Sequence, residues 1–313
     1  MVAAALSASA ATDFDGAFRV RVASYNIRCE TEEADVANVW GSRKADLVNL
    51  VKSMAPDVIG FQEVRTNQTN QYQYLRDQLP GYAFIGEMRD CVARAEATPV
   101  AFLKDRFTPL GSGTFWLSAT PTVPGSTNFE DGVASSLPRV CTWVLLQDRT
   151  SGGAFCFAST HLDHRQRDSR TRAVELILRR LAGFEAKAVP VVVVGDMNAL
   201  ETEASMVAAA KAMQDSLLVS RTPPTGPWRT LNNFMWKDEE PSCAYALANY
   251  SAAARTADKS TLGSRIDYIF TSPGTEVESF AIRNDARPGM RGYPSDHYPI
   301  AAELRMPCAS KVR

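Results

Sequence analysis

The chain has 313 residues, of which 45% are hydrophobic and 22% are charged, and its formal net charge at pH 7 is -1. This composition is typical of a globular protein, and no apolar run approaches the roughly 20 residues that a membrane span needs. The near-zero net charge argues against a strongly basic, nucleic-acid-binding protein, although a nuclease would need only a local basic patch.

Strand and helix signals alternate along the chain without a low-complexity linker. Strands are predicted where β-branched and aromatic residues run together, and helices where apolar residues recur every three or four positions. In the first half, the pattern predicts a strand at 20–25, a helix at 43–54, a strand at 57–61, a polar helix at 69–78, and strands at 82–85, 100–103 and 114–117. In the second half, it predicts strands at 140–146 and 154–159, a helix around 174–181, a strand at 191–194, a helix at 204–213, and strands at 266–270 and 300–304.

Neither the cysteines nor the first residues settle the cellular compartment. The six cysteines form no CxxC pair and no metal-like cluster, so free thiols are favoured and disulfides remain open. Residues 1–12 are small, as near a signal cleavage site, but they lack a basic segment and a full apolar core. A signal remnant, a cloning scar and a frayed terminus all fit this segment. A remnant would favour a secreted or periplasmic location over the cytoplasm.

Polar residues fall at or near the ends of the predicted strands. They are Asn26, Glu63, His161, Asp196, Asn198, Asp267 and the pair Asp296-His297. Each has an ordinary interpretation alone: Asn26 as a turn cap, Glu63 as a surface charge, Asp267 as a partner of Arg265 or Lys259. Together they indicate one cleft, because open α/β sheets present their ligands at strand ends.

The residue types in this set favour phosphoryl chemistry. Oxygen donors without cysteine suit a hard cation, Mg²⁺ or Mn²⁺ with Ca²⁺ as an alternative, better than zinc. Such an ion would neutralise phosphate oxygens, while a carboxylate activates water and a histidine stabilises the developing charge. The chain has neither a Gly-rich phosphate loop ending in Lys-Ser or Lys-Thr nor a GxSxG motif, which argues against nucleotide-driven transfer and serine esterase chemistry.

The motif order resembles that of the endonuclease/exonuclease/phosphatase superfamily over residues 19 to 305. The matching motifs are Asn26 within 24–28, Gln62-Glu63, Thr160-His161-Leu162, Gly195-Asp196-Met197-Asn198, Arg265-Ile266-Asp267-Tyr268 and Ser295-Asp296-His297. Segments 40–44, 112–118 and 137–139 further resemble its uncharacterised bacterial-type hydrolase branch. The resemblance implies the fold of deoxyribonuclease I, a four-layer α/β/β/α sandwich of two packed mixed sheets flanked by helices. A single catalytic domain at 19–308 would then follow a disordered or processed segment at 1–18.

The resemblance also implies residue roles. Glu63 would be the main metal carboxylate, with Asn26 and Asp296 near the same ion. Asp196 would activate the attacking water, Asn198 would hold phosphate or nucleophile, and His297 would donate to phosphoryl oxygens with its ring fixed by Asp267. His161 would be the second catalytic histidine, oriented by Glu96, whose ordinary interpretation is a loop charge near Arg94. Substrate contacts are expected at Asn26, Arg28, Arg139, His164 and Arg165.

The substrate is the least determined feature. The arginine-rich segment 164–172 has enough guanidinium groups for phosphate contacts, or it is a solvated helix start with ion pairs. Trp228 and Trp236 are candidates for the lip of the cleft. The leading interpretation is a metal-dependent phosphoesterase, expected to be a monomer, acting on a small or medium phosphorylated molecule. The alternatives are a nuclease on DNA or RNA, and a noncatalytic binding module on the same fold.

Overall fold

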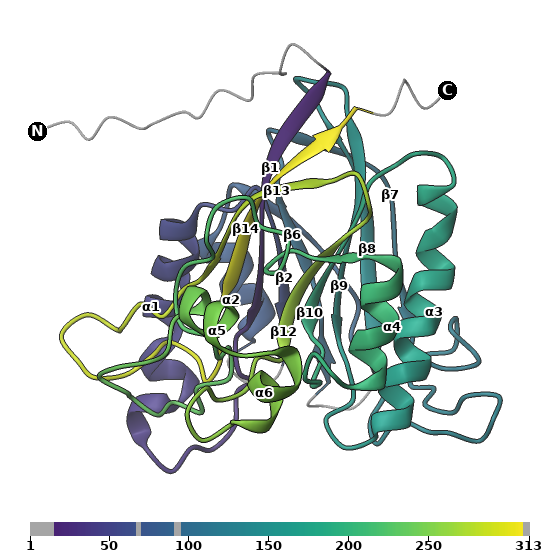
Figure 1. Ribbon diagram of the computed structural model, residues 1–313. Coiled ribbons are helices and arrows are strands. Elements are labelled where there is room, and N and C mark those ends of the chain that lie inside the picture. The colour runs from purple at the N-terminus through teal and green to yellow at the C-terminus, as the bar shows by residue number, and fades with distance from the viewer. Residues whose placement is uncertain (1–15, 67–69, 91–94, 309–313) are drawn as a thin grey trace, which may run out of the picture.

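Two six-stranded sheets lie face to face and helices cover their outer sides (Figure 1). The computed structural model describes residues 16–66, 70–90 and 95–308. The first sheet has the order β13 (Glu276–Ile282), β14 (Ile300–Pro307), β1 (Ala17–Asn26), β2 (Val58–Gln62), β6 (Val100–Leu103) and β4 (Tyr82–Ile85). The second has the order β11 (Gln214–Asp215), β12 (Asp267–Thr271), β10 (Val191–Asp196), β9 (Ala154–His161), β8 (Val140–Asp148) and β7 (Phe107–Trp116). A separate two-stranded sheet pairs β3 (Val64–Arg65) with β5 (Glu96–Ala97).

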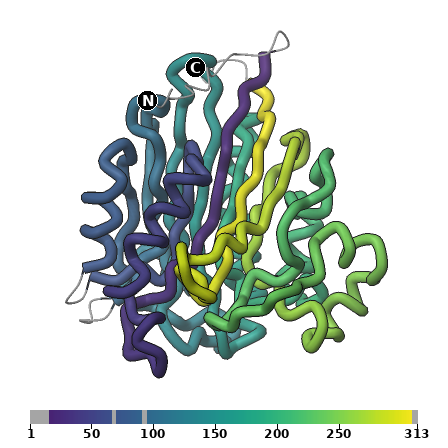
Figure 2. The backbone as a smooth tube through the Cα atoms, turned by 90° about the vertical axis from the view of Figure 1, so that its left-hand side faces the viewer, coloured from purple at the N-terminus to yellow at the C-terminus, as the bar shows by residue number. Residues whose placement is uncertain are grey.

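Each sheet has its own pair of helices. α1 (Trp40–Met54) and α2 (Gln71–Gln78) pack on the first sheet, and α3 (Arg167–Glu185) and α4 (Ala204–Ala212) pack on the second. Two short helices, α5 (Cys243–Asn249) and α6 (Ala252–Ala257), and the 3-10 turn Val36–Asn38 complete the described helices. This confirms the four-layer sandwich. In Figure 2 the purple first strand β1 runs beside the yellow last strand β14, as their antiparallel pairing requires.

Alternating side chains on each strand build three apolar layers. In β10, Val192 and Val194 point into the core between the sheets, whereas Val191 and Val193 point to α3 and α4. In β1, Val20 and Val22 join the same central core, while Ala23 and Tyr25 face α1. Because both faces of the central strands are covered, the sequences of these strands are continuous apolar runs.

The sheets approach each other closely at Gly60 in β2. A Cβ at this position would lie 2.6 Å from Cγ2 of Val194 and 2.7 Å from Oγ of Ser159, so only glycine fits without a shift. Nearby, the Gln62 side chain donates from Nε2 to Ser159 Oγ at 3.2 Å and accepts from Ser24 Oγ at 3.3 Å. The first sheet is therefore bonded to the second close to the end of β2.

Most predicted elements are confirmed, with shifted boundaries. β7 begins at 107, seven residues before the predicted strand at 114–117, and β1 begins at Ala17, ahead of the expected domain start at 19. The predicted helix start at 69 and the segment 1–15 lie outside the described residues. The sequence pattern does not predict β13, because the register of this strand shifts between Val277 and Ser279 and breaks the alternation that marks a strand.

Two further features answer questions left by the sequence. Five cysteines fall in the described part of the chain, and all are free: Cys29, Cys141, Cys156, Cys243 and Cys308. Cys91 lies outside that part. Among the described helices, none combines the length and apolar character needed to cross a membrane.

Candidate active site

Three neighbouring strands of the second sheet bring His161, Asp196 and Asp267 to one edge. In the sheet register, Asp196 at the end of β10 is paired with His161 on one side and with Asp267 on the other. β9 and β10 are parallel and both end here, whereas β12 is antiparallel and begins here. Residues separated by more than a hundred positions in sequence therefore lie in one row.

The first sheet supplies Asn26 and Glu63 to the same place. Asn26 is the last residue of β1, and Glu63 follows β2 directly. The buried Asn26 amide donates from Nδ2 to Glu63 Oε1 at 3.1 Å and to Asp196 Oδ2 at 3.0 Å. Asn26 thus connects the two carboxylates across the interface between the sheets.

Several residues around this edge have left-handed backbone conformations. Glu63 has φ 61°, Asn198 has φ 47° and Arg28 has φ 56°. Such conformations cost about 1–3 kcal/mol for residues other than glycine, and they persist where the surrounding structure holds them. Here they turn the chain at the strand ends, so that the Glu63 and Asn198 side chains face the polar row.

His297 is held as a cation by two carboxylates. Its Nδ1 lies 2.8 Å from Asp267 Oδ2, and its Nε2 lies 3.7 Å from Asp196 Oδ2. Burial alone would lower the pKa of this imidazole, but Asp267 and then Asp196 raise it well above its ordinary value. The expected pairing of His297 with Asp267 is thus present, and it leaves Nε2 directed at Asp196 as a proton donor.

His161 has the opposite protonation state. Burial, reinforced by the positive charge of Arg139, lowers its pKa well below the ordinary value, so the ring is neutral. Nε2 of His161 lies 2.9 Å from the amide Nδ2 of Asn198 and 3.5 Å from Asp196 Oδ2. Because the amide nitrogen can only donate, it makes Nε2 the acceptor, and the ring proton resides on Nδ1.

Asp196 is poised to exchange a proton. Burial raises its pKa to about 7, with help from Asp267 and Glu63, although His297 opposes the shift. The backbone N–H of Asn198 donates to its Oδ1 at 2.9 Å. A carboxylate with this pKa is a suitable general base near neutral pH.

The carboxylates of the site are suited to a hard divalent cation. Two groups of side chains bring their ligand atoms within 4.8 Å of one another: Glu63, His161 and Asp196, and Asp196, Asp267 and His297. Burial by itself would raise the pKa of Glu63, but the N–H donors of Cys29 and Asn26 and the positive charge of His297 keep it below the ordinary value. Glu63 is therefore ionised, and its carboxylate oxygens are of the kind that Mg²⁺ or Mn²⁺ prefers.

Asp296 is less closely placed than the other expected metal ligands. It belongs to neither of the two compact groups found among the described residues, and its Oδ2 lies 3.6 Å from Nη1 of Arg28. Arg28 in turn donates from Nε to Glu33 at 2.8 Å. Asp296 is thus a buried carboxylate that lies beside Arg28 and interacts electrostatically with Glu63.

The expected pairing of Glu96 with His161 is wrong. Glu96 Oε1 accepts from Arg65 at 2.9 Å, and Oε2 accepts from Arg89 at 2.8 Å. Both carboxylate oxygens are therefore used by arginines, and the ion pairs fix β5 against β3 and the loop before it. Arg94, the alternative partner, lies outside the described residues.

The three remaining expected substrate residues form one chain of contacts. Arg139 Nη2 lies 3.0 Å from Nδ1 of His164, and Arg165 Nε lies 3.0 Å from Nε2 of the same ring. Arg139 is buried, whereas His164 and Arg165 are exposed. Farther along the segment, the buried Arg170 bonds to Glu203 and Arg172 bonds to Asp131, so these two arginines hold structure rather than substrate.

Of the two tryptophans expected at the lip, Trp228 is buried. It is 2% exposed and packs beneath the guanidinium groups of Arg255 and Arg265. Trp236 is partly buried and stacks on Tyr293 at 5.2 Å between ring centroids. Cation-π packing and stacking, rather than an open platform, account for both rings.

Two residues that position the site were not singled out from the sequence. Thr230 Oγ1 accepts from the backbone N–H of Asp267 at 3.1 Å, and Ser295 Oγ donates to the Asn26 carbonyl at 2.7 Å. Thr230 follows the Trp228 loop, and Ser295 precedes the Asp296-His297 pair. Ser295 could have been found from the sequence, because it belongs to the Ser295-Asp296-His297 motif. Thr230 could not, because its partner Asp267 lies 37 residues away in the sequence.

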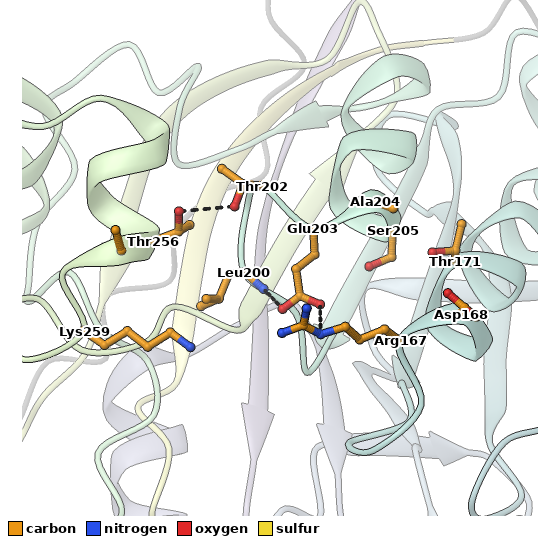
Figure 3. A pocket seen from close by; sticks show the side chains of 11 residues that line it. Arg167, Asp168, Thr171, Leu200, Thr202, Glu203, Ala204, Ser205, Thr256 and Lys259 are labelled. Atoms are coloured by element: carbon orange, nitrogen blue, oxygen red, sulfur yellow. Dashed lines mark hydrogen bonds and ion pairs between the residues drawn. The ribbon is translucent and has the colours of Figure 1, made fainter.

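A cavity of about 560 Å³ has Leu200, which follows Asn198 by two positions, among its lining residues (Figure 3). Arg167 and Lys259 reach toward it from opposite sides, and Thr202 and Thr256 lie at its upper edge. None of the catalytic candidates lines this cavity, so it does not contain the polar row. Its size suits a small ligand or the non-reacting part of one.

Comparisons with known proteins agree with this geometry. The profile of the Endonuclease/Exonuclease/phosphatase family matches residues 23–297. A family protein of known structure from Bacteroides vulgatus is 29% identical, with a TM-score of 0.76, covering 92% of this chain and 99% of that one. No curated protein sequence matches the chain.

Two further structures show how varied similar proteins are. A mannosyl-6-phosphatase from Bacteroides thetaiotaomicron is 29% identical, with a TM-score of 0.73, and the match covers 91% of this chain and 99% of that one. The human nocturnin catalytic domain with bound sulfate is 20% identical, with a TM-score of 0.64, and the match covers 91% and 93% of the two chains. The second likeness concerns the fold alone.

Proposed function

The chain belongs to the endonuclease/exonuclease/phosphatase family of phosphoester hydrolases, and from this membership we propose that it is a divalent-metal-dependent phosphoesterase acting on a small or medium phosphorylated substrate. The reaction is the attack of water on phosphorus, in a phosphomonoester or a phosphodiester. One bond forms between the water oxygen and phosphorus, and the bond from phosphorus to the leaving oxygen breaks.

One observation carries this proposal. A single oxygen of Asp196 lies between a neutral imidazole and a cationic one, at 3.5 Å from His161 and 3.7 Å from His297. Acid-base catalytic sites typically contain neighbouring titratable groups whose environments give them different protonation states. A structural ion-pair network would not need two histidines in opposite states on one carboxylate.

The roles follow from these states. Asp196 accepts the proton of the attacking water, while the cationic His297 donates from Nε2 to a nonbridging phosphoryl oxygen. The Asn198 amide bonds to Nε2 of His161 and to the Leu162 carbonyl, and it thereby holds the neutral ring in one orientation. Asp267 keeps the His297 proton on the correct nitrogen.

Glu63 and Asn26 would hold the cation, with Asp296 and Asp196 near it. The bound ion would neutralise phosphate oxygens and stabilise the charge that develops on them. Asn26 has a second task, since it donates to both Glu63 and Asp196 and keeps the two carboxylates at a fixed separation.

A small substrate is favoured over a nucleic acid by charge. The net charge of -1 gives the protein little long-range attraction for a polyanion. The similar mannosyl-6-phosphatase is, by its name, an enzyme for a phosphorylated sugar, which supports the same class of substrate.

A substrate panel tests the proposal. p-Nitrophenyl phosphate, bis-p-nitrophenyl phosphate, sugar phosphates, plasmid DNA and RNA would each be incubated with Mg²⁺ or Mn²⁺, and again after chelation. We expect metal-dependent release of phosphate or nitrophenol from the small esters and slow cleavage of the polymers. Efficient nicking of supercoiled DNA at low salt, lost at moderate salt, would instead establish a nuclease.

A further inference from the structure

Arg43, in the first turn of α1, is a buried cation whose hydrogen bonds go to backbone carbonyls. The residue is 1% exposed. Its acceptors within the described chain are Asn38 at 2.8 Å from Nε, Ile27 at 2.6 Å and Pro294 at 3.0 Å from Nη1, and Arg28 at 2.7 Å from Nη2. One side chain therefore ties together four backbone positions from three segments of the chain.

Two of these segments carry residues that are expected to hold the cation. Asn26 directly precedes the bonded pair Ile27-Arg28, and Asp296 follows Pro294 by two positions. The two segments also bond to each other, because Ser295 Oγ donates to the Asn26 carbonyl at 2.7 Å. The guanidinium group therefore connects the end of β1 to the segment that leads into Asp296, although 251 positions separate the arginine from Pro294.

The bonded pair Ile27-Arg28 also lies between the two donors that hold Glu63. Before it, Asn26 Nδ2 donates to Glu63 Oε1 at 3.1 Å, and after it, the backbone N–H of Cys29 donates to Oε2 at 2.9 Å. Arg28 has φ 56°, a left-handed conformation that residues other than glycine rarely adopt. Its carbonyl accepts from Gln71 Nε2 at 3.1 Å as well as from Nη2 of the arginine in α1. These bonds hold the turn that presents both donors to Glu63.

The same guanidinium group lies against two aromatic rings. Its Cζ is 5.2 Å from the ring centroid of Trp40 and 5.6 Å from that of Phe234. Cation-π contacts are stronger where the cation is desolvated, as it is here. Just before Phe234, the N–H groups of Asn232 and Asn233 donate to the Asp296 carbonyl at 2.7 and 3.0 Å. The arginine therefore also supports the segment that bonds to the backbone of Asp296.

We propose that Arg43 is a positioning residue of the cation site, which fixes Asn26, Glu63 and Asp296 relative to one another. The N–H donors of a guanidinium lie in one rigid plane, so carbonyls bonded to it cannot move independently. Its hydrogen bonds in the described chain go to none of the proton-transfer residues of the second sheet. The effect of Arg43 therefore falls on cation binding rather than on proton transfer.

That the cation serves hydrolysis rests on the proposed function, but its binding can be measured without a substrate. Mn²⁺ would be titrated into the metal-free chain by isothermal titration calorimetry, for the native protein and for Arg43→Met. Methionine fills much of the same space and donates no hydrogen bond. Because groups that orient metal ligands typically change metal affinity by 10- to 100-fold, we expect the Kd for Mn²⁺ to rise by roughly that factor. A native Kd in folded Arg43→Met overturns the proposal.

Arg287→Met is the matched control. Arg287 is also buried and also bonds around the start of α1, to the backbone carbonyls of Ala37 and Ser42 and to the carboxylate of Asp46. None of these acceptors lies in a segment with an expected cation ligand. We expect Arg287→Met to lower the midpoint of thermal unfolding, since three acceptors lose their donor, and to keep the native Kd for Mn²⁺. An equal rise of Kd in both variants would make Arg43 a structural residue only, and it would overturn the proposal.

Arg43→Lys provides the test if Arg43→Met does not fold. Lysine keeps the charge but carries one nitrogen, so it cannot reach all the carbonyls that Arg43 reaches from three nitrogens. We expect the Kd for Mn²⁺ to rise roughly tenfold in this variant. A native Kd in Arg43→Lys would show that the charge alone suffices, and hydrogen-bonded positioning would be overturned.

Hydrolysis of p-nitrophenyl phosphate separates cation binding from the chemical step. For Arg43→Met, we expect the Mn²⁺ concentration at half-maximal rate to rise in parallel with the Kd, and most of kcat to return at saturating Mn²⁺. A kcat that stays low at saturating Mn²⁺, with a native half-maximal concentration, would place the effect outside the cation site and overturn the proposal. If the native protein hydrolyses no ester while Mn²⁺ binding depends on Arg43, the proposed function fails and the positioning role stands.

Discussion

Asp267 accepts a hydrogen bond from Nδ1 of His297 across 2.8 Å, and both side chains are buried. The carboxylate is the main reason that the imidazole remains protonated in a place where burial would otherwise discharge it. The behaviour of this pair leads to the first prediction.

Asp267→Asn should lower kcat/KM by roughly 10²- to 10⁴-fold at neutral pH. Without the carboxylate the pKa of His297 falls, so the cation is lost at a lower pH and the alkaline limb of the rate profile moves toward acid. The pH dependence of p-nitrophenyl phosphate hydrolysis measures this shift. A profile that keeps its alkaline limb in place would show that His297 is not the cationic donor.

Chelation should abolish activity, and Mg²⁺ or Mn²⁺ should restore it, whereas Zn²⁺ should substitute poorly because the donors are oxygens. Glu63→Gln should chiefly raise the metal concentration needed for half-maximal rate. Glu175→Gln, which alters an outward-facing residue of α3, serves as the control. Glu63 would be excluded as a ligand if the metal titration of its variant matched that of the control.

The two neighbouring histidines should differ in importance. His161→Ala should lose at least roughly 10²- to 10⁴-fold in kcat, like Asp196→Asn and His297→Ala, and the losses should not add because the three residues act in one step. His164→Ala should lose less, since this ring is exposed and bonds only to arginines. Steady-state kinetics of the folded variants decide the order, and a reversed order would mean that His164 is the catalytic ring.

Asp163 should make stability depend on acid. Burial would raise its pKa, but the N–H groups of Gln166 and Arg165 and the Ser136 hydroxyl and N–H lower it to about 2. Its contribution is fully present above the unfolded pKa near roughly 4 and is lost as pH falls through the folded value. Asp163→Asn should therefore cost about 1–3 kcal/mol at pH 7 and progressively less below about pH 4. Urea unfolding of both proteins at pH 7 and at pH 2 checks this. An equal loss of unfolding free energy at the two pH values would contradict it.

The double variant Arg165→Ala/Arg167→Ala should change KM for a small phosphoester without a steep dependence on ionic strength. Arg167 lines the cavity of Figure 3, and Arg165 contacts His164, so each can offer one local contact rather than track a polymer backbone. The rates of both forms would be measured between low and moderate salt. A strong salt dependence that the substitutions remove would favour nucleic acid as substrate.

The sequence predicts the catalytic row well because strand ends are local features. The β-branched run before Asp196 defines a buried strand, and the residue after such a strand must emerge at the sheet edge. The Asp267 and His297 pairing could be anticipated only from the family resemblance, because it joins residues on different segments. Their distance in the fold is set by sheet order, which no local pattern contains.

The misassigned residues fail for a common physical reason. Glu96 and Trp228 each have a sequence neighbourhood that suits a functional residue, yet their partners come from distant segments. Arg65 and Arg89 occupy the oxygens of Glu96, while Arg255 and Arg265 cover the Trp228 ring. Arginines that pair with buried side chains are indistinguishable in sequence from arginines that bind substrate.

The Asn26 bridge makes the hydrolytic centre a property of two docked sheets rather than of either one. Glu63 comes from the first sheet and Asp196 from the second, and the bridge exists only while Gly60 lets the sheets meet. Activity therefore depends on the docking of the two sheets. A partial unfolding that separated them would abolish activity even if each sheet kept its own hydrogen bonds. In a denaturant series, activity should disappear no later than the far-ultraviolet signal of secondary structure.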